Sequence, residues 1–72
     1  MAYALSILRD ADAPYWDKAE AESFLRSEMI RPTFWIAGKV VGWRVSFVDG
    51  FAMTREPERV FAEWLRSALA EA

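Results

Sequence analysis

The 72-residue chain contains neither cysteine nor histidine. Without these residue types, the commonest general bases, thiol nucleophiles and zinc ligands are missing, and no disulfide framework can form. No stretch approaches the roughly 20 apolar residues of a membrane-spanning helix, and the N-terminal residues lack the basic start of a secretory signal peptide. We therefore expect a cytoplasmic, non-enzymatic protein with no cofactor, no metal and no membrane partner.

The sequence has no cluster of like-charged residues. The net charge is −2, and residues 1–31, 32–54 and 55–72 carry −2, +1 and −1. No basic run exceeds one residue, whereas proteins that bind phosphate backbones cluster their Lys and Arg side chains. Asp10, Asp12 and Asp17 lack the glycine and the terminal glutamate of an EF-hand loop. Nucleic acid is thus an unlikely partner, and no cation site is expected.

Aromatic residues are abundant, with four Trp, five Phe and two Tyr. A domain of this length buries only about 60% of its unfolded surface, so these side chains are the main supply of core material. We expect a single α+β domain spanning residues 1–72.

The segment from Thr33 to Thr54 predicts a three-stranded antiparallel meander. Gly38-Lys39 suits a two-residue type II′ turn, and Asp49-Gly50 suits a type I′ turn. This register places Ile36 opposite Val41. Because side chains alternate along a strand, one face is expected to form the core: Phe34, Ile36, Val41, Trp43, Val45 and Phe47.

The opposite sheet face is unusually apolar, because only Arg44 and Ser46 interrupt it. The solvated face of an antiparallel sheet is normally polar. In the predicted register Trp35 lies opposite Gly42, and Arg44 is close enough to stack on the indole. Either a helix or the N-terminal segment covers this face, or it is a binding surface. The candidate partner-binding residues are Trp35, Lys39, Val40, Arg44, Val48, Phe51 and Met53.

Two helices are expected to flank the sheet. The first begins at Asp17, where a capping box reaches Glu20 and Trp16 packs back onto Ala21. It ends before Pro32, and its inward stripe consists of Ala21, Phe24, Leu25 and Met29. The second helix has Thr54 as a cap and Pro57 in its first turn. Its apolar stripe consists of Val60, Phe61, Trp64, Leu65, Ala68 and Leu69.

Residues 1–16 are ambiguous in the sequence. Tyr3, Leu5 and Ile7 alternate as in an edge strand, although Ala and Leu also support a short helix. A polar connector from Arg9 to Pro14 follows. With the strand, the order is β-α-β-β-β-α and the sheet gains a fourth strand. If residues 3–9 instead lie over the face that carries Trp35, that face is not free for a partner.

Three functions fit these expectations. The first is a protein-binding module, acting as an inhibitor or regulator of a larger cellular machine. The second is a homodimer formed through the same face, and the third is a nucleic-acid-binding domain whose sheet aromatics stack on bases. In length, acidity and lack of cysteine the chain resembles phage-encoded inhibitors of host RNA polymerase or CRISPR complexes. Its sheet followed by a helix is similar in architecture to integrase arm-binding domains. No residue motif carries either likeness.

Overall fold

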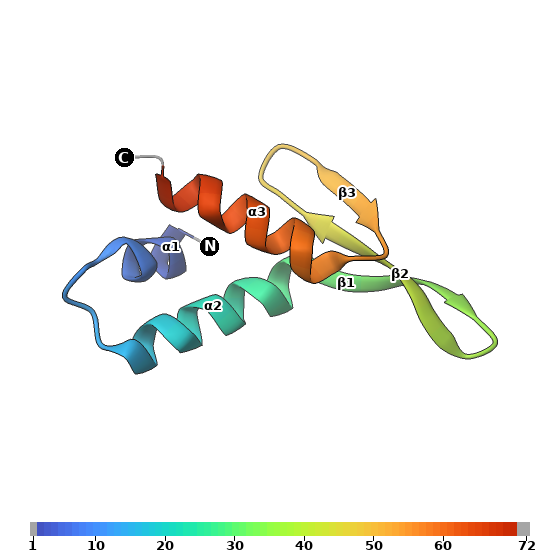
Figure 1. The fold of residues 1–72 in the computed structure, drawn as a ribbon, viewed down its shortest axis with the longest axis horizontal. Coiled ribbons are helices and arrows are strands. Elements are labelled where there is room, and N and C mark those ends of the chain that lie inside the picture. The colour runs from blue at the N-terminus through green and yellow to red at the C-terminus, as the bar shows by residue number, and fades with distance from the viewer. Residues whose placement is uncertain (1, 71–72) are drawn as a thin grey trace.

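The computed structural model describes residues 2–70, and this part of the chain has the predicted α+β architecture with a three-stranded antiparallel sheet (Figure 1). The strands lie in the order β1-β2-β3. The elements are α1 (Ala2–Arg9), α2 (Tyr15–Met29), β1 (Ile30–Ile36), β2 (Lys39–Ser46), β3 (Phe51–Thr54) and α3 (Pro57–Ala70).

The N-terminal segment is a helix, so the predicted edge strand is wrong and the alternative short helix is confirmed. Ala4 is buried, and Leu5, Ile7 and Leu8 pack against the same core at helical spacing. The Arg9 guanidinium donates a hydrogen bond to the carbonyl of Ala68, where a cation complements the C-terminal end of the α3 dipole. Helix α1 therefore packs against α2 and α3 and does not become a fourth strand.

Helix α2 begins two residues earlier than the sequence predicts. Pro14 is its N-cap residue, with no side-chain hydrogen bond to the first turn. The predicted capping box at Asp17 is therefore wrong, and Trp16 is exposed instead of packing back onto Ala21. The predicted inward stripe is largely confirmed, because Ala21, Leu25 and Met29 are buried while Phe24 is half-exposed.

Helix α2 runs directly into β1 with no intervening loop. The N–H of Ile30 still donates to the carbonyl of Arg26, although the backbone of Ile30 is already extended. Strand β1 therefore begins three residues before the predicted start at Thr33 and contains Pro32. Proline is accommodated because β1 is an edge strand, where a missing N–H costs no central ladder bond.

The first hairpin turn is Ala37-Gly38, and not Gly38-Lys39 as predicted. Both residues have positive φ, 52° and 80°, as a type I′ turn requires. Ile36 therefore pairs with Lys39 and Trp35 with Val40, whereas irregularities on either side of Phe34 set Phe34 opposite Gly42. The predicted pairing of Trp35 with Gly42 is wrong because the turn lies one residue earlier, which moves the register by two residues.

The second hairpin has a four-residue loop instead of the predicted two-residue turn. Ser46 pairs with Phe51, and the N–H of Phe47 donates to the carbonyl of Gly50 over 2.7 Å. This register also differs from the prediction by two residues. Because side chains alternate with period two, an even shift leaves each residue of β2 and β3 on its predicted face.

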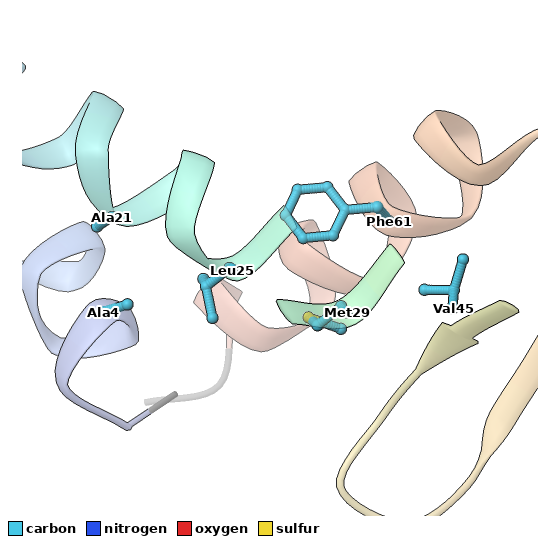
Figure 2. Close-up of a cluster of buried hydrophobic side chains, with 6 residues drawn as sticks. All are labelled: Ala4, Ala21, Leu25, Met29, Val45 and Phe61. Carbon is cyan, nitrogen blue, oxygen red and sulfur yellow. The ribbon is translucent and has the colours of Figure 1, made fainter. Parts of the chain in front are cut away.

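The core lies where α2, α3 and one end of the sheet meet. Figure 2 shows its buried side chains, which are Ala4, Ala21, Leu25, Met29, Val45 and Phe61. Phe61 comes from the predicted stripe of α3, and Val60, Trp64 and Leu65 of that stripe pack beside it. Trp64 stacks on Phe47 with ring centroids 6.4 Å apart. Leu69, at the end of the stripe, is more exposed.

The helices cover only part of the sheet. The β1–β2 hairpin extends beyond them at one end of the molecule (Figure 1). Phe34 and Ile36 are 59% and 60% exposed, so their predicted place in the core is wrong. Val45 is buried in the core as predicted, and Phe47 is partly buried and packs against the core.

Candidate functional site

The sheet has an outer face, which we define as the side turned away from the helices. Val45 points into the core, so Arg44 and Ser46 on β2 belong to the outer face by alternation. Directly paired residues share a face, which adds Met53 opposite Arg44 and Phe51 opposite Ser46. We find no element packed over these side chains within residues 2–70.

Large apolar side chains on the sheet are half-exposed or more. Trp35, Phe51 and Met53 expose 54%, 57% and 52% of their surface. Of the other residues predicted to bind a partner, Lys39, Arg44 and Val48 are exposed and Val40 is partly buried. The structure groups Arg44, Phe51 and Met53 on adjacent strands, places Trp35, Lys39 and Val40 toward the hairpin tip, and sets Val48 in the β2–β3 loop.

The Arg44 side chain stacks on Phe51. Its guanidinium carbon lies 4.3 Å from the centroid of the Phe51 ring, a favourable cation–π geometry. The predicted stacking of Arg44 on Trp35 is therefore wrong. The contact holds the guanidinium on the β3 side of β2, beside Met53.

A shallow hollow lies over Gly42 on this face. A Cβ atom built on Gly42 would lie 3.1 Å from the Cβ of Phe34, so β1 approaches β2 closely here and a larger residue at this position would crowd Phe34. The hollow has a volume of about 330 Å³ and is lined by Phe34, Val41, Gly42, Met53, Thr54 and Arg55.

Sequence reasoning missed three residues of this surface, Arg31, Phe34 and Arg55. The sequence predicts that Arg31 lies at the end of a helix, because the first strand of the meander is expected to start at Thr33. In the structure Arg31 lies directly opposite Arg44. The lack of any Gly or polar linker between the helical pattern and Pro32 is the signal that could have indicated a direct helix-to-strand junction.

The sheet is basic and the rest of the chain is acidic. Residues 30–55 contain four basic side chains, Arg31, Lys39, Arg44 and Arg55, against one acidic side chain, Asp49. Within the described part of the chain, no carboxylate lies within 4.0 Å of any of the three arginines.

Two arginines of the helices, Arg26 and Arg59, do form ion pairs. Arg26 lies 3.0 Å from Glu58 and 3.5 Å from Glu22. On α3, the hydrogen bond that Arg59 donates to Glu63 and the negative charge of Glu56 raise the pKa of Arg59 above its ordinary value. Within residues 2–70 the arginines of the sheet thus take no part in the ion pairs, and neither do Arg9 and Arg66 on the helices.

A second hollow separates α1 from α2. It has a volume of about 450 Å³ and is lined by Tyr3, Ala4, Ile7, Asp17, Glu20, Ala21 and Phe24. Tyr3 and Phe24 are exposed there, next to two carboxylates.

The accessible surface of the molecule is larger than that of a compact domain of the same mass. Its radius of gyration is 13.5 Å, against roughly 11 Å for a compact domain of this length. Its accessible area is 5362 Å², against about 4,600 Å² for a compact 8.3 kDa protein. The excess of about 800 Å² reflects the elongated shape of the molecule.

Residues 2–70 contain no group of three or more acidic side chains arranged to hold a metal ion. In the same range, no helix combines the length and apolarity needed to cross a membrane. Comparisons with protein-family models, curated proteins and solved structures found no match to this chain.

Proposed function

We propose that this protein is a non-enzymatic protein-binding module that docks its outer sheet face onto a larger protein. The observation that carries the proposal is the exposure of Phe51, Met53 and Arg44 on adjacent strands, continuous with Trp35 toward the hairpin tip. Contiguous apolar surface on a small protein is typical of interaction sites, and Trp and Arg are enriched among the residues that dominate binding energy. Such a module acts by occupancy, as an inhibitor or regulator of the protein that it covers.

A heterologous partner fits this face better than a second copy does. In a twofold-symmetric dimer the same patch of both copies meets at the axis. A contact centred on the Arg31–Arg44 pair would set this pair against the same pair of the other copy, and burying like charges together is unfavourable. A homodimer through the outer face is therefore the weaker alternative.

Affinity capture tests the proposal with two matched variants. Trp35→Asp places a charge on the exposed hairpin, whereas Trp16→Asp makes the same change at another exposed tryptophan, on α2. We expect wild type and Trp16→Asp to capture the same protein from nuclease-treated lysate, and Trp35→Asp to lose it while keeping its thermal unfolding midpoint.

Light scattering provides the companion measurement. A chain mass of 8.3 kDa at high concentration supports the heterologous partner. A mass twice as large that returns to the monomer value in Trp35→Asp would instead assign the face to homodimerisation. Capture that is identical for all three proteins would contradict docking through this face.

A further inference from the structure

Building on the proposed protein-binding function, we infer that the partner of the outer face is an acidic, extended protein segment. It places carboxylates against Arg31 and Arg44 and an apolar side chain in the hollow over Gly42. The inference specifies the chemistry of the partner, and it is carried by the charges and the shape of this face.

The first step is the like-charged pair across β1 and β2. Arg31 lies directly opposite Arg44, and like charges in such a position destabilise a sheet. Neither has a carboxylate within 4.0 Å among residues 2–70. Carboxylates from outside the chain relieve this repulsion, and the planar guanidinium fork binds them in a bidentate geometry.

The second step is the direction in which the two arginines diverge. Stacking on Phe51 draws the Arg44 guanidinium toward β3, whereas Arg31 belongs to β1 on the other side of β2. The two cations therefore offer separate positions for carboxylates, and an acidic segment with more than one carboxylate can satisfy both.

The third step is the spacing between the hollow and the cations. Gly42 and Arg44 are two residues apart on one strand, which corresponds to about 6.6–6.8 Å. In an extended partner segment the same distance separates residues i and i+2. An apolar residue over Gly42 thus places an acidic residue two positions away beside Arg44. Arg55 lines the same hollow and follows Thr54, the partner of Trp43, so it lies beside Gly42 on the β3 side and offers a position for a second carboxylate.

Protein is favoured over nucleic acid by the charge distribution. Three arginines face outward with the sheet, but the remainder of the chain is acidic and the net charge is −2. A phosphate backbone would extend past the sheet toward these acidic helices. A short acidic segment neutralises the arginines without that repulsion.

Binding of labelled peptides, measured by fluorescence anisotropy, tests the inference. The probe is a 9-residue peptide with a central Glu-Ser-Leu-Ser-Glu, compared with Ser-Ser-Leu-Ser-Ser and Glu-Ser-Ser-Ser-Glu versions. We expect the first peptide to bind most tightly, and its affinity to fall about tenfold in the Arg31→Ser/Arg44→Ser variant. Arg66→Ser, which removes an exposed arginine from α3, is the matched control and should bind as wild type does. Gly42→Val should remove the preference for leucine over serine.

Several results would overturn the inference. These are equal binding of the Glu-flanked and Ser-flanked leucine peptides, affinities that do not respond to the loss of Arg31 and Arg44, and no binding of any peptide at millimolar concentration. Tighter binding of a 12-nucleotide oligo(dT), with the same dependence on both arginines, would assign the face to nucleic acid. If lysate capture still requires Trp35 but not these arginines, the proposed function stands and only the acidic partner is refuted.

Discussion

The guanidinium carbon of Arg26 lies 5.5 Å from the centroid of the Phe61 ring. A half-exposed cation on α2 thus covers the largest fully buried side chain of the core, which belongs to α3. The same guanidinium group is within ion-pair distance of Glu58 at the start of α3. Arg26 therefore joins two helices through an aromatic contact and a charge contact at once.

Replacement of Arg26 should reveal this double role. We expect Arg26→Ala to lower the free energy of unfolding by about 1–2 kcal/mol, because it loses both the covering of Phe61 and the partly exposed ion pair. Arg26→Met keeps the apolar stem and should recover roughly half of the loss. Urea unfolding measures both values, and a variant as stable as wild type would show that the contact contributes nothing.

Two phenylalanines distinguish the observed core from the predicted one. Phe61 is 1% exposed, whereas Phe34, predicted to lie in the core, is mostly exposed. We expect Phe61→Ala to cost about 3–5 kcal/mol and Phe34→Ala to cost less than about 1 kcal/mol. Thermal or urea unfolding of both variants measures the difference. Equal losses would mean that Phe34 is buried and that the sheet register of the prediction was right after all.

The helical stripes were predictable because they depend on local spacing. The stripe of α3 and the positions of Ala21, Leu25 and Met29 on α2 follow from the period of 3.6 residues alone. The start of α2 could not be predicted in this way, because its N-cap residue is Pro14, which makes no side-chain hydrogen bond to the first turn. The N-terminal helix was also missed, since its choice over a strand depends on packing against α2 and α3, which a local pattern does not encode.

The outer face was predicted in composition but not in detail. Arg44, Phe51 and Met53 kept their face because both hairpins differ from the prediction by an even number of residues. Trp35 lost its predicted neighbour because the first turn lies one residue earlier than predicted, and the bulges next to Phe34 changed the partner of Phe34 as well. No propensity rule places two irregularities around one residue, so the hollow over Gly42 was not visible in the sequence.

The Ala37-Gly38 turn is a position where stability can be raised. Ala37 has a φ of 52°, a left-handed conformation that costs a residue with a Cβ about 1–2 kcal/mol. Asparagine tolerates this conformation better, and Asn-Gly is the favoured pair for a type I′ turn. We expect Ala37→Asn to raise the free energy of unfolding by about 0.5–1 kcal/mol.

The opposite change at the same position provides the control. Ala37→Val introduces a β-branched side chain that is strained at positive φ, so urea unfolding should show a loss of about 1 kcal/mol or more. Stabilisation by valine would indicate that the turn is Gly38-Lys39, as the sequence first suggested, because Ala37 would then be a strand residue.

Gly42 tests whether the close approach of β1 and β2 determines this part of the sheet. An added Cβ would lie 3.1 Å from the Cβ of Phe34, so we expect Gly42→Ala to lower the free energy of unfolding by about 1 kcal/mol. Gly50→Ala is the control, because nothing lies within 4 Å of its added Cβ, and its stability should change by less than about 0.5 kcal/mol.

A double-mutant cycle tests the contact between Gly42 and Phe34 directly. Since the clash involves the Cβ of Phe34, Phe34→Ala cannot relieve it, whereas Phe34→Gly can. A double-mutant cycle should therefore give favourable coupling between Gly42→Ala and Phe34→Gly and none with Phe34→Ala, and equal coupling in both cycles would contradict the observed pairing.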